Sequence, residues 1–289
     1  MTTNAHEEYD FKWCPGCGDF GVRRALEFAM AERMSKLETS MENNVVVTGI
    51  GCSGNLVHLL EGPQPYGFHG IHGRTLPLAL GIKMARPDLN VVVAAGDGDF
   101  LSIGMEHIAP QAARNLDVCA LVMDNGIYGL TKGQSSPTTH PGTVTVSTPY
   151  GKTEEAVNPL ALYLTLGVTF IASGFSAKPR DLAKLIAAGM EHQGFAIVQV
   201  QSPCTSYNDT YDLLKGDRKK GIAPVLHDVP EAHDPTDRQA ASNLIYSPGI
   251  PIGIIYKDET RLALHQRIEE AQKRVKPKSA QELVDSFAV

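Results

Sequence analysis

The sequence lacks the features that would place the chain in a membrane, on a nucleic acid or outside the cell. The longest apolar runs among its 289 residues are the length of a strand, far short of the ~20 apolar residues of a membrane span. The N-terminal residues are acidic and lack the apolar core of a signal peptide. A net charge of −6 gives no support for nucleic-acid binding. We therefore expect a cytoplasmic protein that binds neither membranes nor nucleic acids.

Internal repeats and low-complexity blocks are also absent, and five cysteines in such a chain argue against a disulfide framework. What is present is an alternation of strand-like and helix-like segments. Apolar runs at 44–49, 91–95, 118–123, 168–172, 195–200 and 252–256 predict strands, and residues 22–36, 76–85 and 178–190 have helical spacing. A single helix of roughly a dozen residues is expected after Asp99. Nearly continuous apolar strands predict an α/β fold with a mostly parallel sheet and helices on both faces. Residues 135–159 are expected to form a long irregular loop.

Oxygen-bearing side chains follow two of these strands directly. Gly96, Asp97, Gly98 and Asp99 come after the strand at 91–95, and Asn125 follows the strand at 118–123. Carboxyl ends of neighbouring parallel strands share one edge of the sheet, where α/β folds bind ligands. A carboxylate and an amide there suit Mg²⁺, which takes phosphate oxygens to complete its octahedron. The pattern indicates a metal-bridged diphosphate site, with a plain strand-to-helix turn as the alternative.

Four of the cysteines need a separate explanation. Cys14 and Cys17 form a C-x-x-C pair, whereas Cys52 and Cys204 each follow a predicted strand, at the same edge as Asp97. A C-x-x-C pair is typical of zinc knuckles and redox pairs, but a [4Fe–4S] cluster accepts scattered thiolates. Cys119 lies inside an apolar run and is expected to pack in the core.

Longer stretches of the sequence resemble a known family. The spacing from Gly96-Asp97-Gly98 to Asn125 resembles the thiamine-diphosphate motif. WCPGCGDF, IGCSGN, FHGIHGR, YGLTKGQ and SPCTSYND resemble the β subunit of 2-oxoacid:ferredoxin oxidoreductases, over about residues 11–210. The resemblance implies a thiamine diphosphate-binding domain of the diphosphate (PP) type at 1–210, which includes the C-x-x-C loop. Residues 211–289 would be an extension that packs on this domain or on a partner subunit.

The resemblance also implies roles for individual residues. Asp97, Asn125 and the backbone carbonyl of Ile127 would bind Mg²⁺, and Cys14, Cys17, Cys52 and Cys204 would hold one [4Fe–4S] cluster. His72 and Lys132 would be catalytic, with Lys132 at the mouth of the substrate pocket. The remaining residues implied to contact thiamine diphosphate are Ile50, Gly51, Cys52, Ser53, His69, His72, Gly73, Gly96, Gly98, Asp99, Gly129 and Leu130. The motif usually has a second Asn where this chain has Asp124, and several relatives carry a basic residue where it has Asn55.

The implied reaction is the coenzyme A-dependent oxidative decarboxylation of a 2-oxoacid, with electrons passing through the cluster to ferredoxin. A cation at Lys132 suits a dicarboxylate, so 2-oxoglutarate is the expected substrate, with pyruvate or a broad 2-oxoacid range as the alternative. The carboxylate that activates thiamine would come from an α subunit, in an αβ or (αβ)2 assembly. Two rival functions are a non-oxidative thiamine-dependent lyase or synthase subunit and a zinc-stabilised interaction module. The basic cluster at 215–220 is either a solvated loop or a docking site for an acidic partner.

Overall fold

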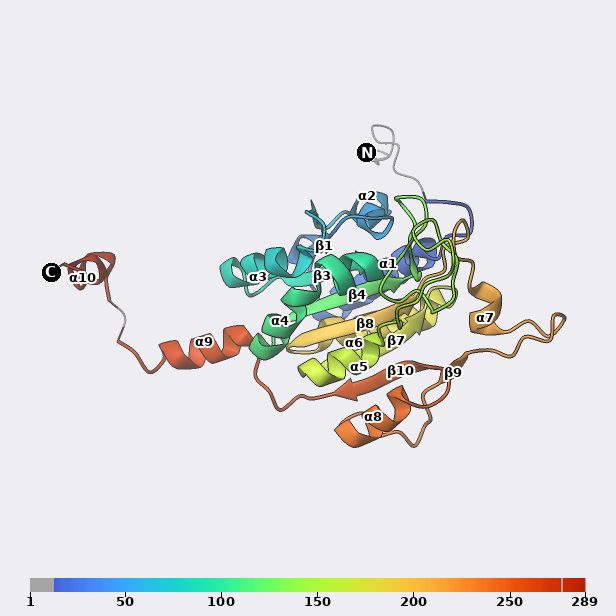
Figure 1. The fold of residues 1–289 in the computed structure, drawn as a ribbon. Coiled ribbons are helices and arrows are strands. Elements are labelled where there is room, and N and C mark those ends of the chain that lie inside the picture. The colour runs from blue at the N-terminus through green and yellow to red at the C-terminus, as the bar shows by residue number, and fades with distance from the viewer. Residues whose placement is uncertain (1–12, 277, 289) are drawn as a thin grey trace.

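An eight-stranded sheet forms the centre of the computed structural model, which describes residues 13–276 and 278–288 (Figure 1). The acidic residues 1–12, on which the prediction of no signal peptide rests, lie outside the described residues. The strand order is β2-β1-β3-β4-β8-β7-β10-β9. The bounds are β1 (Asn44–Thr48), β2 (Tyr66–His69), β3 (Asn90–Gly96), β4 (Val118–Asp124), β7 (Phe170–Phe175), β8 (Phe195–Gln201), β9 (Leu226–Asp228) and β10 (Ile250–Lys257). A separate two-stranded ribbon pairs β5 (Ile127–Tyr128) with β6 (Gln134–Ser135).

Strand direction confirms the mostly parallel sheet. All pairs from β2 through β7 are parallel, and only β10 runs antiparallel to its neighbour β7. The two strands at the β10–β9 edge come from the C-terminal part of the chain, so this part continues the main sheet. The predicted strand at 252–256 lies within β10, whereas β9 has only three residues and too short a pattern to predict.

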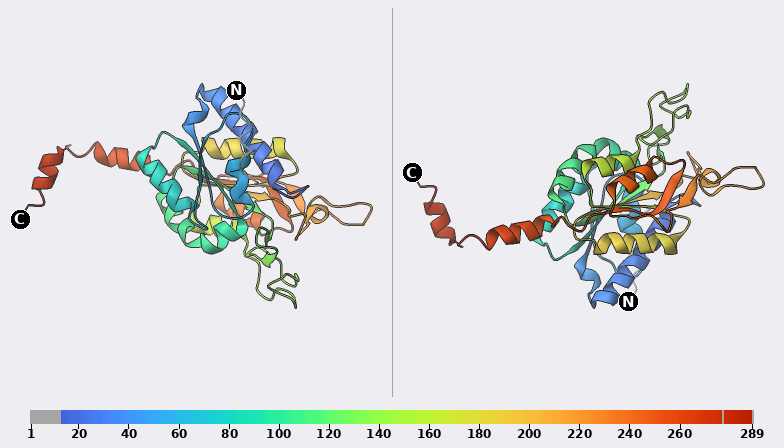
Figure 2. Two further views of the ribbon diagram at one scale, coloured as in Figure 1. Left: turned by 90° about the horizontal axis from the view of Figure 1, so that it is seen from above. Right: turned by 90° about the horizontal axis from the view of Figure 1, so that it is seen from below.

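Helices cover both faces of the sheet (Figures 1 and 2). α1 (Asp19–Leu37) and α6 (Pro179–Glu191) pack on one face, together with Val46 and Val92. α3 (Thr75–Ala85), α4 (Ile108–Arg114), α5 (Pro159–Leu166) and α8 (Arg238–Ile245) cover the other, where Val45 and Val47 point. Because successive strand residues face opposite ways, a strand buried on both sides must be apolar throughout. The shorter or peripheral helices are α2 (Leu56–Leu59), α7 (Tyr211–Lys215), α9 (Leu264–Gln272) and α10 (Ala280–Asp285).

The segment that follows Asp99 differs from the single helix of about a dozen residues that the sequence predicts. It consists of a π-helical turn at Asp99–Ile103, a 3₁₀ turn at Met105–His107 and then α4. The Gly104 N–H donates to the Asp99 carbonyl, which closes the wide first turn. The Asp99 side chain is at the same time held by two other loops, and this long-range constraint overrides the local helical preference.

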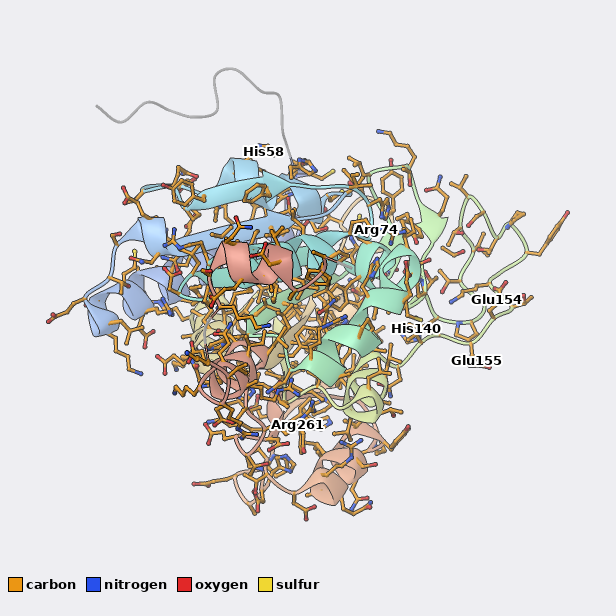
Figure 3. All side chains as sticks on the ribbon, turned by 90° about the vertical axis from the view of Figure 1, so that its left-hand side faces the viewer. His58, Arg74, His140, Glu154, Glu155 and Arg261 are labelled. Atoms are coloured by element: carbon orange, nitrogen blue, oxygen red, sulfur yellow. The ribbon has the colours of Figure 1, made fainter. Side chains whose placement is uncertain are left out.

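Two segments stand away from the body of the molecule. The irregular loop that carries His140, Glu154 and Glu155 projects from one side (Figure 3). Hydrogen bonds inside the loop hold its conformation, because the buried Lys152 ammonium donates to the carbonyls of Ser136, Pro137 and Thr139. α9 and α10 form an arm that extends away from the body in a different direction (Figure 2). No helix among residues 13–276 and 278–288 combines the length and the apolar character needed to cross a bilayer.

Candidate cofactor site at the carboxyl edge of the sheet

Four neighbouring strands end at the same place. β1, β3, β4 and β8 are consecutive in the sheet, and their carboxyl ends lead to Cys52, Asp97, Asn125 and Cys204. A cavity lies at this edge and brings together the loops after β1, β3 and β4 with the loop that follows β2. Thirteen of the residues implied by the sequence line it: Ile50, Gly51, Cys52, Ser53, His72, Gly96, Asp97, Gly98, Asp99, Asn125, Ile127, Gly129 and Leu130.

Two carboxylates meet at the cavity: the buried Asp97, which lines it, and the partly buried Asp124 beside it. The Thr138 hydroxyl lies 2.7 Å from Asp97 Oδ2 and 2.8 Å from Asp124 Oδ1, and the Asn125 N–H lies 3.4 Å from Asp97 Oδ1. Burial, and next the Asp124 carboxylate, raise the pKa of Asp97. No ion pair within the described residues involves either carboxylate. A divalent cation fits this donor set, because its positive charge would compensate the two carboxylates, which have no other cationic partner among the described residues.

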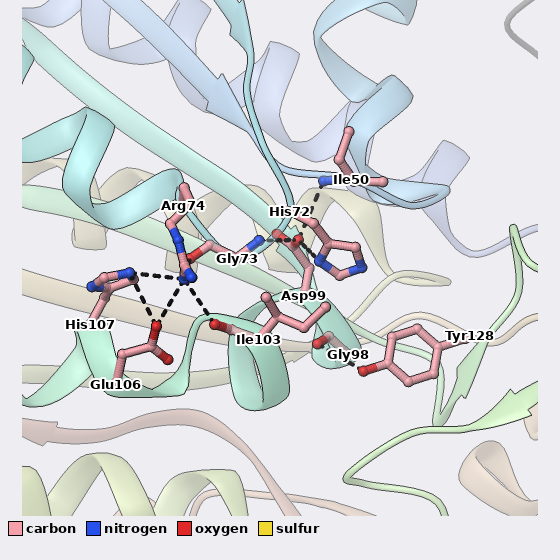
Figure 4. A network of polar contacts seen from close by, with 10 residues as sticks. All are labelled: Ile50, His72, Gly73, Arg74, Gly98, Asp99, Ile103, Glu106, His107 and Tyr128. Atoms are coloured by element: carbon pink, nitrogen blue, oxygen red, sulfur yellow. Dashed lines mark hydrogen bonds and ion pairs between the residues drawn. The ribbon is translucent and has the colours of Figure 1, made fainter.

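Asp99 connects three loops of the cavity (Figure 4). Its Oδ1 accepts hydrogen bonds from the Gly73 N–H at 2.7 Å and the Ile50 N–H at 3.3 Å. The same oxygen lies 2.5 Å from His72 Nδ1, so His72 is held by a carboxylate that is only 2% exposed. Burial raises the pKa of Asp99 even though these donors favour its charged form. Asp99 therefore holds the loops after β1 and β2 against the turn that follows β3.

Tyr128 forms part of the wall beside this turn. Its hydroxyl donates to the Gly98 carbonyl at 3.1 Å, and its ring centroid lies 6.4 Å from that of His72. A Cβ on Gly98 would come within 2.2 Å of the Tyr128 ring, so only glycine fits at this position. The glycine thus lets the Tyr128 ring pack against the backbone of a turn that begins a helical segment, the type of backbone that can bind a diphosphate.

The loop with Cys14 and Cys17 is fixed to the same edge. The Trp13 indole N–H donates to the Cys52 carbonyl at 2.8 Å, and the Gly18 N–H donates to the Pro203 carbonyl at 3.0 Å. Cys52 and Cys204 both lie beside Gly129, since a Cβ there would be 3.6 Å from one sulfur and 3.5 Å from the other. Cysteines that are far apart in the sequence thus meet beside the cavity.

The four thiols are close enough to influence one another. Burial raises the pKa of Cys52 to about 12, with further increases from Asp19, Cys204 and Cys14. Burial likewise raises the pKa of Cys17, and after Asp19 both Cys52 and Cys204 contribute. Thiols in such surroundings become thiolates only when a metal replaces the proton. Cys119, by contrast, is buried within β4 among apolar side chains, as expected.

The thiols do not converge on a single point. Among residues 13–276 and 278–288, no three His, Cys, Asp or Glu side chains are grouped as ligands of one metal ion would be. A structural zinc site binds four converging ligands, and a [4Fe–4S] cluster is held by four thiolates.

Besides Cys14, Cys17 and Cys204, three residues implied by the sequence lie outside the cavity lining. His69 has its Nδ1 2.7 Å from Nε2 of His58, and Gly73 takes part through its N–H to Asp99. Lys132 is exposed and has a φ of 83°, a left-handed conformation that is unfavourable for a lysine.

Sequence reasoning missed several residues that build the site. Met123 lines the cavity and the Thr138 hydroxyl lies 2.7 Å from Asp97 Oδ2, but no sequence motif pointed to either residue. Thr131 also lines the cavity and lies within YGLTKGQ. The hydroxyl of Ser202 donates to the buried Asp19 at 2.7 Å, and Asp19 also lines the cavity. The signal for Asp19 and Tyr128 was their place within the motifs WCPGCGDF and YGLTKGQ.

Comparison with known proteins gives consistent matches. Residues 49–200 match the family model for the thiamine pyrophosphate enzyme C-terminal TPP binding domain, and residues 222–273 match the model for the C-terminal part of the pyruvate ferredoxin oxidoreductase β chain. The 2-oxoacid:ferredoxin oxidoreductase subunit β of a Sulfolobus species is 40% identical over 264 residues, which cover 89% of this chain and 85% of that protein. The 2-oxoglutarate oxidoreductase subunit KorB of Mycobacterium tuberculosis is 40% identical over 228 residues, covering 77% and 58%.

A solved structure is similar over almost the whole chain. It is a chain of the 2-oxoglutarate:ferredoxin oxidoreductase from Magnetococcus marinus, with 2-oxoglutarate, coenzyme A and succinyl-CoA bound. The two chains are 38% identical with a TM-score of 0.86, and the match covers 98% of this chain and 94% of that one.

Proposed function

The chain belongs to the thiamine diphosphate-binding β subunits of the 2-oxoacid:ferredoxin oxidoreductases, and we propose that it works on 2-oxoglutarate with Mg²⁺ and one [4Fe–4S] cluster. The observation that carries this proposal is the meeting of the thiols and the Asp97 cavity at one sheet edge. Cys52 lines the cavity itself, and its sulfur flanks Gly129 together with that of Cys204. An electron acceptor would thus lie directly beside the cofactor.

Asp97, Asn125 and the Ile127 carbonyl are the proposed Mg²⁺ ligands, and Gly98, Asp99 and Gly129 would line the diphosphate. Replacing Asp97 by Asn should weaken Mg²⁺-dependent thiamine diphosphate binding by more than the roughly 10–100-fold expected for a residue that only supports a ligand. Asp124→Asn is the matched control, because the family motif usually has Asn at this position. Calorimetric titration of the assembled enzyme measures both affinities, and equal losses in the two variants would contradict the ligand assignment.

The chemistry divides between the cofactors and the protein. Thiamine diphosphate supplies an electron sink for the loss of CO₂ from a 2-oxoacid, and a [4Fe–4S] cluster accepts electrons singly. Asp99, 2.5 Å from His72 Nδ1, favours the tautomer with the proton on that nitrogen. Nε2 is then available to exchange a proton with the substrate, which is the proposed role of His72.

A dicarboxylate substrate is supported by Lys132. Holding a lysine at a φ of 83° costs on the order of 1 kcal/mol, and such strain concentrates at ligand sites. Replacing Lys132 by Met removes the charge and should lower the kcat/KM ratio of 2-oxoglutarate over pyruvate by roughly 10–100-fold, the value of one charged hydrogen bond. The control Lys132→Arg should keep the preference. An unchanged ratio in the Met variant would favour pyruvate or a broad 2-oxoacid range.

The site needs a second subunit to be complete. We propose that an α subunit brings the carboxylate that activates the thiamine ring and the main coenzyme A contacts, in an αβ or (αβ)2 assembly. Residues 1–210 would form the cofactor domain, and residues 211–289 an extension that packs on this domain or on a partner subunit. Coenzyme A-dependent oxidation of 2-oxoglutarate should require both subunits, and full activity of this chain alone would contradict the proposal.

A further inference from the structure

A dense group of positive charges lies next to the thiols. The segment 215–220, called the basic loop here, holds Lys215, Arg218, Lys219 and Lys220, four cations in six residues of a chain whose net charge is −6. It begins at the end of α7 and continues into a projecting hairpin (Figure 1). The net negative charge of the chain would repel an acidic protein. A local group of positive charges such as the basic loop therefore favours approach of an acidic protein at that place.

One tyrosine connects the basic loop to the C-x-x-C loop. The Tyr211 hydroxyl donates to the Gly16 carbonyl at 3.1 Å, between Cys14 and Cys17. The Lys215 ammonium lies 5.9 Å from the centroid of the Tyr211 ring. Cys14 is itself exposed. The four cysteines therefore reach the surface in the C-x-x-C loop, which Tyr211 contacts.

Part of this charge is free to meet a partner. Lys220 pairs with Asp212 at 2.5 Å and Asp217 at 3.6 Å, and Lys215 lies 3.8 Å from Asp212. Arg218 and Lys219 are exposed and form no ion pair within the described part of the chain. The four cations of the basic loop lie near three carboxylates, the exposed Asp209 and the two paired aspartates. The net charge of this surface is therefore +1.

The hairpin is preformed. The N–H groups of Asp217 and Ile222 donate to each other's carbonyls at 2.9 Å, and the Lys219 N–H donates to Asp217 Oδ1 at 2.9 Å. Little ordering is therefore needed when a partner binds, which favours fast association.

We propose that the basic loop is the docking surface for an acidic electron-carrier protein of the ferredoxin class. The inference rests on the proposed cluster, which would lie one tyrosine away from the loop. In each encounter a cluster held by Cys14, Cys17, Cys52 and Cys204 would give one electron to the oxidised carrier, with no covalent bond formed or broken. Two encounters remove the two electrons of one decarboxylation. The alternative occupant of the basic loop is the partner subunit, and the rate of methyl viologen reduction separates the two.

Charge reversal of the unpaired cations is the direct test. The double variant Arg218→Glu/Lys219→Glu, in the complex with its partner subunit, is assayed with a small acidic bacterial ferredoxin as acceptor. The ferredoxin KM should rise by about 10-fold at low ionic strength, because steering by a complementary patch changes association by 10-fold or more. The difference should shrink at high salt, where exposed charges are screened. Binding of oxidised ferredoxin to the immobilised complex should show the same loss of affinity.

A matched control exists on the far side of the molecule. Lys273 and Arg274 are an adjacent, exposed basic pair at the end of α9, away from α7 (Figure 1). Reversing both charges alters the net charge by the same amount and should leave the ferredoxin KM within about 2-fold of the wild type, since screening limits charge effects to roughly 10 Å.

The artificial acceptor methyl viologen distinguishes the possible failures. It needs no protein docking, so its reduction rate should be unchanged in the basic-loop variant. Loss of this rate together with loss of the partner subunit would show a subunit interface and overturn the proposal. An unchanged ferredoxin KM and affinity would overturn it as well. Iron and acid-labile sulfide are measured on the same preparations: their absence would refute the proposed cluster, while ferredoxin binding would still test the docking surface.

Discussion

Removing the Asp99 carboxylate should loosen three loops of the cofactor cavity together. The side chain is 2% exposed, and it accepts hydrogen bonds from the main-chain N–H groups of Gly73 and Ile50. Asp99→Ala leaves both donors without a partner, at ~1–3 kcal/mol each. Removing a carboxylate whose pKa is raised by burial offsets part of this cost, so we expect a net loss of about 3 kcal/mol in local stability. Asp99→Asn keeps an acceptor oxygen and should lose about 1 kcal/mol.

Hydrogen exchange measures this local stability directly. In the assembled enzyme, peptides covering residues 47–54 and 70–76 should exchange roughly 100-fold faster in Asp99→Ala, and less than 10-fold faster in Asp99→Asn. Peptides from α6 serve as the internal control and should not change. Normal exchange in both loops, combined with weak thiamine diphosphate binding, would refute the reasoning. Asp99 would then act as a direct ligand and not as a clamp.

Two further predictions concern packing and pH. Gly21→Ala places a Cβ 1.9 Å from the Ser176 carbonyl oxygen and should destabilise the fold by ~1–3 kcal/mol. In Gly81→Ala the new Cβ meets nothing within 4 Å, so this variant should stabilise α3 by ~0.5–1 kcal/mol. Unfolding midpoints that shift in the same direction would contradict this pair. Burial, and next Lys257, lower the pKa of His192 to about 4, so the unfolded chain binds the proton more tightly. Stability should therefore rise by up to about 3 kcal/mol from pH 4 to 6.5, and His192→Gln should flatten that rise in pH-dependent denaturation.

Most of the sheet could be predicted because its signals are local. The strands β1, β3, β4 and β8 are short and apolar, and each is within two residues of its predicted bounds. Glycine-containing turns follow β1, β3 and β4. Once they are parallel, their carboxyl ends must share an edge, so the meeting of Cys52, Asp97 and Asn125 follows from chain direction alone.

What could not be predicted depends on contacts between distant segments. β2 is exposed along its length and has no apolar pattern, so only its pairing with β1 makes it a strand. Thr138 reaches Asp97 from inside the irregular loop, 41 residues away in the sequence. The turn after Asp99 widens because loops at Ile50 and Gly73 hold its side chain. Local propensity carries no information about any of these contacts.

Iron analysis tests the central claim most directly. The claim is that Cys14, Cys17, Cys52 and Cys204 hold a cluster beside the thiamine cavity, while Cys119 only fills the core. Anaerobically prepared complex should contain the iron and acid-labile sulfide of one [4Fe–4S] cluster per chain, and Cys119→Ser should keep both. Cys52→Ser should lose them and lose ferredoxin reduction. Zinc in place of iron in the wild type, or full iron and sulfide in Cys52→Ser, would contradict the account.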